Sequence, residues 1–109
     1  MPFDPKSVLK DMLGAAAQTA KTKWPEIQMI ATQEIRNIAV RIKEILVALA
    51  DGSMKPKAAK TLMTMIKNHS IATVAMMTTL IATLVASVIN AALAVVRQAV
   101  NTAAGFVLI

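Results

Sequence analysis

The sequence predicts an all-α fold: a helical hairpin that is preceded by an amphipathic helix and includes a long, strongly apolar C-terminal helix. Three observations lead to this prediction. Apolar residues recur at the three- and four-residue spacing of helices along most of the chain. Capping residues, prolines and glycines stand where such helices would begin and end. Aromatic residues make up only 3% of a chain that is 56% hydrophobic, so its apolar content is aliphatic and fits helices packed side by side.

The first helix is expected over residues 5–23, within a single unit that spans residues 1–109. Asp4 can cap its first turn, and Pro5 has the backbone angle that a first turn needs. Its apolar side is expected to carry Val8, Leu9, Met12, Leu13, Ala16 and Ala20. Such a helix either lies on a membrane surface, with its lysines toward anionic headgroups, or docks on protein. The sequence leaves these two alternatives open.

The second helix is expected over residues 25–50, after a joint that contains Trp24 and Pro25. Gly52 suits the left-handed position after a helix, and the short connection makes the second and third helices an antiparallel hairpin. The third helix is expected over residues 56–104, with Gly105 at its end. A helix of that length would be about 75 Å long at 1.5 Å per residue.

The third helix contains a run without any charged residue, over residues 70–96. A helix needs roughly 20 apolar residues to cross a bilayer, so the run predicts a transmembrane segment over residues 71–96. All but one of the 12 lysines and arginines precede this segment, and Arg97 is the exception. The positive-inside rule therefore places the basic N-terminal side inside, at a cell inner membrane or an internal virion membrane.

A helical wheel of this run separates small residues from bulky ones. Small residues along one ridge allow two helix backbones to approach closely, and their hydroxyl and amide groups can form bonds across the contact. We therefore expect a self-association face that makes the protein a homo-oligomer. Its residues would be Ala75, Thr79, Ala82, Thr83, Ala86, Ser87, Asn90 and Ala94. The bulky side, which includes Leu84, Val85 and Val88, would face lipid or more protein.

Positive charge gathers at the start of the third helix, in a chain with a net charge of +6. Four lysines stand there without a nearby acid: Lys55, Lys57, Lys60 and Lys67. Such a cluster favours anionic lipid headgroups or nonspecific contact with nucleic acid phosphates. Aromatic residues for base stacking are scarce, which makes nucleic acid the secondary expectation.

No catalytic or metal-binding pattern stands out in the sequence. The chain has no cysteine and a single histidine, His69, so neither a thiolate site nor a multi-histidine metal site can form within one chain. Three glycines do not make a phosphate-binding loop. We therefore expect no enzyme activity, no cofactor and no small-molecule substrate.

These features predict a small integral membrane protein that self-associates and serves as a structural component of a membrane assembly, for example in a membrane-containing virus particle. One alternative is a holin-like or other helical pore-former, in which the hydroxyl and amide groups of the small-residue face line a channel. The other is a soluble or peripheral helical rod that assembles into a bundle, ring or filament. The second alternative requires the apolar run to be buried by protein instead of lipid.

Overall fold

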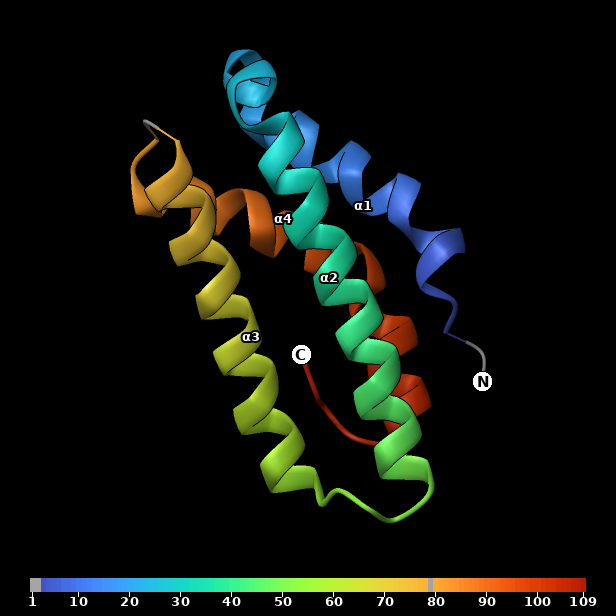
Figure 1. The fold of residues 1–109 in the computed structure, drawn as a ribbon. Helices are drawn as coiled ribbons and strands as arrows, with labels where there is room; N and C mark the ends of the chain where they lie inside the picture. The colour runs from blue at the N-terminus through green and yellow to red at the C-terminus, as the bar shows by residue number, and fades with distance from the viewer. Residues whose placement is uncertain (1–2, 79) are drawn as a thin grey trace.

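The computed structural model describes residues 3–78 and 80–109. Within these residues the chain forms α1 (Pro5–Ala20), a 3₁₀ turn (Lys21–Lys23), α2 (Trp24–Ala50), α3 (Pro56–Met77) and α4 (Ala82–Ala104), and it forms no strand (Figure 1). The predicted all-α fold with an antiparallel α2–α3 hairpin and a long apolar C-terminal helix is confirmed. The bundle measures 42 × 23 × 18 Å.

Local capping explains where the helices begin and end. The Asp4 carboxylate accepts a hydrogen bond from the Lys6 backbone N–H at 3.1 Å, and Pro5 opens α1. Gly52 and Gly105 follow α2 and α4 with φ angles of 80° and 84°, as their left-handed positions require. These caps depend on neighbouring residues alone, which is why the sequence indicated them.

The expected continuous helix over residues 56–104 is wrong, because the chain turns between α3 and α4. Thr78 is extended, with φ −132° and ψ 175°. Its hydroxyl donates to the Val74 carbonyl oxygen at 2.8 Å and accepts from the Leu80 N–H at 3.3 Å, so the side chain replaces helical backbone bonds. The turn also folds α4 back onto the bundle, whose longest dimension of 42 Å is far short of a straight helix of about 75 Å.

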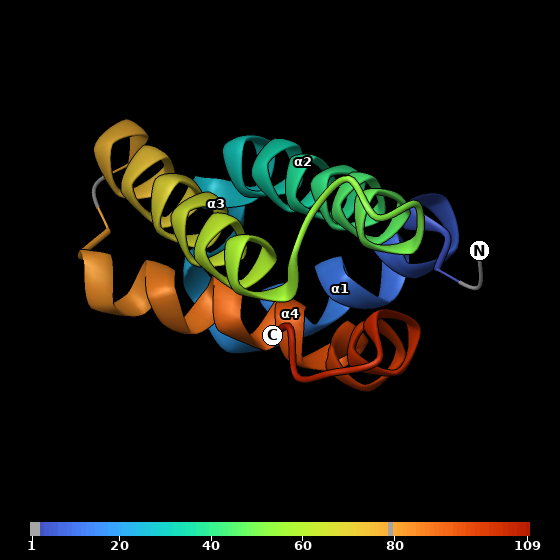
Figure 2. The same cartoon turned by 90° about the horizontal axis from the view of Figure 1, so that it is seen from below.

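The helices form two layers around one aliphatic core. Seen along the bundle, α2 and α3 lie in one layer and α1 and α4 in the other (Figure 2). The core consists mainly of aliphatic side chains from all four helices; the largest that are fully enclosed include Met12, Ile27, Ile35, Ile38, Ile42, Ile45, Leu46, Val74, Val85, Val88 and Ile89. Because aromatic side chains are few, many small contacts along the helices replace the large ones of an aromatic core.

Helix α1 is a docking helix. It packs chiefly against α4, and Met12, Ala16 and Ala20 are buried in that contact. Lys6 and Lys10 stay exposed on its other side. Of the two alternatives that the sequence left open for this helix, docking on protein is the one that the bundle contains.

The segment after α4 folds back on the same helix. The Asn101 Oδ1 atom accepts the N–H groups of Leu108 and Ile109 at 2.8 and 3.0 Å, and Asn101 Nδ2 donates to the Ile109 carbonyl oxygen at 3.1 Å. Leu108 is thereby buried, whereas Val107 points outward. One polar side chain therefore holds the backbone of the apolar tail while Leu108 joins the core.

Candidate membrane-facing surface

The small-residue face of α4 lies on the outside of the bundle. Ala82, Thr83, Ser87, Asn90 and Ala94 are exposed. Ala86 and Ala75 are half-buried, and Thr79 lies outside the described residues. The Ser87 hydroxyl donates to the Thr83 carbonyl oxygen of its own helix at 3.2 Å, which leaves the hydroxyl oxygen free to accept another bond. The side of α4 without charge is thus turned away from the core.

The bulky face of α4 is inside the bundle and not on its surface. Val85, Val88 and Ile89 are buried, as are Leu93 and Val96. The sequence led us to expect lipid or more protein against this face, and the chain covers it with its own helices α1, α2 and α3. Part of the predicted bulky side remains outside: Met77, Ile81 and Val95 are exposed.

The turn between α3 and α4 forms an exposed apolar tip. We use "apolar tip" for Met76, Met77, Leu80 and Ile81. Met76, Met77 and Ile81 are 85%, 70% and 70% exposed, and Leu80 is half-buried. Because the sequence from residue 70 to residue 96 is uncharged, the helical turns on either side of the tip carry no charged side chain.

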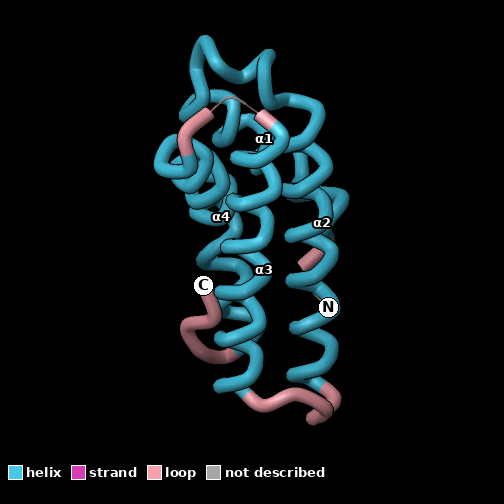
Figure 3. The backbone as a smooth tube through the Cα atoms, turned by 60° about the vertical axis from the view of Figure 1, so that its left-hand side comes forward, coloured by secondary structure: helices cyan, strands magenta, loops and turns pink. Residues whose placement is uncertain are grey.

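The apolar tip shares one end of the bundle with the turn between α1 and α2 (Figures 1 and 3). That turn carries Lys21 and Lys23, both exposed, followed by the half-buried Trp24. Lys21 has a φ of 53°, a rare conformation for a residue with a side chain. Lys23 forms an exposed ion pair with Glu26 at 3.8 Å. The sequence placed Trp24 at a joint between two helices, but it could not place that joint at the same end of the bundle as the α3–α4 turn.

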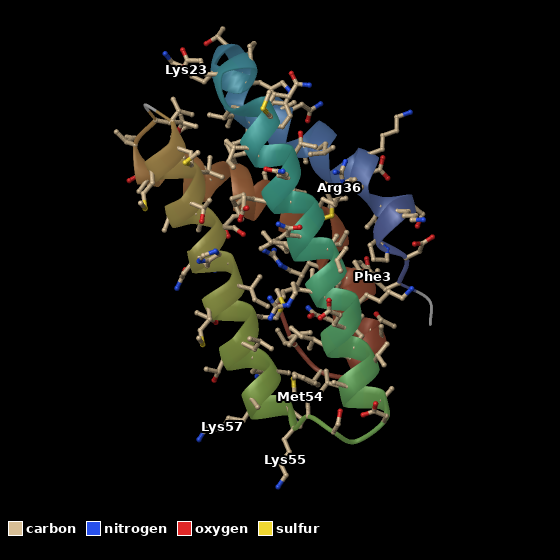
Figure 4. All side chains as sticks on the ribbon, in the orientation of Figure 1. Phe3, Lys23, Arg36, Met54, Lys55 and Lys57 are labelled. Carbon is tan, nitrogen blue, oxygen red and sulfur yellow. The ribbon has the colours of Figure 1, made fainter. Side chains whose placement is uncertain are left out.

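The four lysines of the predicted basic cluster follow α3 away from the tip. Lys55 and Lys57 are exposed at the opposite end of the bundle from Lys23 (Figure 4). The Lys60 ammonium lies 5.7 Å from the centre of the Phe106 ring, in a cation–π contact. Lys67 is half-buried and lines a small hollow of about 80 Å³ with Asn90 and Arg97. The lysines of the predicted cluster therefore do not share one common environment.

A wider groove of about 630 Å³ runs between α2 and α3. Its apolar wall includes Ile38, Leu62 and Ile66. The Ser70 hydroxyl, which sequence reasoning missed, is buried there and donates to Glu34 Oε1 at 3.0 Å. Among the described residues, no three histidine, cysteine or acidic side chains come together in an arrangement that could hold a metal ion.

Helix α4 is long and apolar enough to span a membrane by length and composition, with a mean hydropathy of 1.6 in its most apolar segment. This candidate span, Ala82–Ala104, differs from the expected 71–96 because the α3–α4 turn interrupts the earlier range. In the bundle, 39% of that segment is buried. To span a bilayer, α4 would have to leave its contacts with the other helices.

Comparison with protein-family models, curated proteins and solved structures finds no match to this chain.

Proposed function

We propose that this protein is a non-enzymatic structural component of a membrane assembly. It associates with a bilayer through the uncharged turn between α3 and α4 and self-associates through the outer face of α4. The observation that carries this proposal is the continuity of two exposed features without charge: the apolar tip and the small-residue side of α4. The membrane is a cell inner membrane or an internal virion membrane, with the basic N-terminal side inside.

The apolar tip supplies the reason for bilayer contact. Fully burying one Met or Ile side chain gains about 1.5–3 kcal/mol relative to leaving it in water. Met76, Met77 and Ile81 forgo most of that gain in the isolated bundle. A hydrocarbon or protein environment recovers it, and neither requires a charged group at the tip.

The outer face of α4 supplies the reason for self-association. Thr83, Ser87 and Ala94 have short side chains, which allow a second helix to approach closely. A helix surface that faces water normally carries lysine, arginine or glutamate. The exposed surface of α4 carries none of these up to residue 96. A homo-oligomer whose subunits meet at α4 covers this face without disturbing the core.

Flotation with vesicles, carbonate extraction and chemical cross-linking test the proposal together. We expect the protein to float with vesicles and to cross-link into discrete oligomers. Failure to float with vesicles of any composition would refute membrane association. Release of a trapped dye from the same vesicles would favour the pore-forming alternative.

Cysteine labelling distinguishes a spanning α4 from a hairpin that contacts one leaflet. The chain has no cysteine, so Ser53→Cys and Thr102→Cys each introduce a single label. The α2–α3 connection and the end of α4 lie toward the same end of the bundle (Figure 1). A closed bundle therefore exposes both cysteines on one side of the bilayer, whereas a spanning α4 exposes them on opposite sides.

A second candidate function is a soluble or peripheral subunit of a helical assembly. The burial of Val85, Val88 and Ile89 within one chain favours it, because the most apolar side of α4 then needs no lipid. Such a protein would form the same cross-linked oligomers in the absence of vesicles and would remain at the bottom of a flotation gradient.

A further inference from the structure

We infer that the bundle docks with its apolar tip on anionic phospholipid bilayers while its helices stay packed. The tip enters the boundary between headgroups and acyl chains, and Lys21 and Lys23 contact lipid phosphates. This inference rests on the proposed membrane association, to which it adds the lipid class, the docking end and the closed state of the bundle.

The apolar part of the docking surface has the chemistry of a shallow wedge. Met76, Met77 and Ile81 are among the most exposed large apolar side chains of the described residues. Met76 and Met77 end α3 and Ile81 directly precedes α4, and the chain on either side of them carries no charge from residue 70 to residue 96. Insertion of this turn would therefore desolvate no charged side chain of the hairpin.

The basic part comes from a different region of the chain. The 3₁₀ turn Lys21–Lys23 lies at the same end of the bundle as the tip, and neither lysine is needed for the core (Figure 3). Lys23 pairs with Glu26 at 3.8 Å, but both side chains are about half exposed, and such surface pairs are weak. Positive charge beside an apolar wedge is complementary to an anionic lipid surface.

Trp24 lies at the same end of the bundle as the two parts. It follows Lys23 directly, is half-buried and is the first residue of α2, a helix that begins at the end of the bundle that carries the tip (Figure 1). Tryptophan favours the headgroup level of membranes, where its apolar ring and polar N–H are both accommodated. As the only tryptophan, it is also a native fluorescent probe of this end.

The opposite end provides a built-in comparison. Lys55 and Lys57 give it positive charge as well, but Asp51 stands in the same connection. If only positive charge attracted the bundle to an anionic membrane, either end could bind. Docking through the apolar tip instead requires the end that carries Lys21 and Lys23.

Vesicle flotation of the full chain tests the apolar wedge. We expect binding to vesicles of phosphatidylcholine with about one-quarter phosphatidylglycerol and little binding to phosphatidylcholine alone. Met77→Glu should lower that binding by about tenfold or more, since it places a charge in the wedge. Met65→Glu is the matched control on α3, because Met65 is 62% exposed away from the tip and the substitution adds the same charge.

The lysines are tested by charge removal at each end. The double variant Lys21→Gln with Lys23→Gln should weaken binding to anionic vesicles by about fivefold per lysine, the usual effect of one basic residue near such a surface. Lys55→Gln with Lys57→Gln removes the same charge from the other end and should change binding little. A loss in the second pair and not in the first would overturn the inference.

Trp24 fluorescence reports the docked geometry. We expect a blue shift on anionic vesicles and quenching by brominated acyl chains, with an unchanged helical signal in circular dichroism. A bound protein whose Trp24 emission does not change would overturn tip-first docking. Equal binding to neutral and anionic vesicles would overturn the lipid selectivity and leave the proposed membrane association standing. Absence of binding to both vesicles would refute the inference together with the proposed function.

Discussion

Helices α2 and α4 bury aliphatic stripes of the same kind but present different chemistry to the outside. Ile35 in α2 and Ile89 in α4 are both fully buried. The exposed side of α2 carries charged residues such as Arg36 and Lys43, whereas the exposed side of α4 carries Ser87 and similar small residues up to residue 96. Both helices therefore contribute to the core, but only α2 has a charged outer face that is suited to water.

This difference separates two kinds of information in an amphipathic helix. The buried stripe contributes to the fold, because its shape must fit the other helices. The outer face contributes to the choice of surroundings, because charged side chains favour water and small uncharged ones tolerate a helix or lipid. The high hydropathy of α4 arises because its outer face lacks the charges that lower the hydropathy of α2.

The largest expected effect on stability comes from substitutions in the buried aliphatic stripes of α2 and α4. Ile89→Ala and Ile35→Ala should each lower the free energy of unfolding by about 2–5 kcal/mol, since each removes a buried side chain from a packed core. Urea unfolding followed by circular dichroism measures both. If Ile89→Ala were neutral while Ile35→Ala destabilised the protein, α4 would not pack in the bundle as described.

A smaller effect is expected where α4 ends. Asn101→Ala removes the three hydrogen bonds that hold residues 108 and 109 and should cost about 1–3 kcal/mol of unfolding free energy. Asn101→Asp keeps the acceptor for the Leu108 and Ile109 N–H groups and should recover part of that loss. Equal stability of all three proteins would show that the tail is not held by this side chain.

The outer faces are compared by adding one leucine to each of two helices. Ser87→Leu on α4 should weaken self-association by about 0.6–2 kcal/mol, since it separates the backbones and removes a hydroxyl. Thr61→Leu on α3 is matched, because both hydroxyls are exposed and donate to a carbonyl oxygen four residues earlier, at 3.2 and 3.1 Å. Cross-linking yields follow the oligomers; equal losses in both variants would contradict a specific α4 interface.

The smallest expected effect concerns the end of α2 and depends on pH. Hydrogen bonds from Ser53, through its side chain and its backbone N–H, lower the pKa of Asp51 from its ordinary 3.8. A lowered pKa stabilises the fold above the ordinary value, and this contribution is lost as the pH falls through the folded-state pKa. Asp51→Asn should therefore lower the melting temperature slightly near neutral pH, and the difference should vanish in strong acid. Asn101→Ala adds and removes no titratable group, so this variant provides the pH-independent comparison.

Much of the fold could be read from residues that act on their near neighbours. Asp4 and Pro5 at the start of α1, and Gly52 and Gly105 after α2 and α4, exert their effects within a few residues. The spacing of Ile35, Ile38 and Ile42 likewise predicts a buried face without knowledge of what covers it. Sequence reasoning also separated the small residues of α4 from the bulky ones on the same local grounds.

The turn between α3 and α4 was beyond local reasoning, because no proline or glycine marks it. Thr78 and its neighbours are compatible with a helix, and the chain turns there because α4 gains more by packing against α1, α2 and α3 than by continuing α3. The same packing brings Lys21 and Lys23 to the end that carries Met77. Periodicity and caps follow from the backbone of one helix, whereas these placements depend on contacts between segments that are distant in the chain.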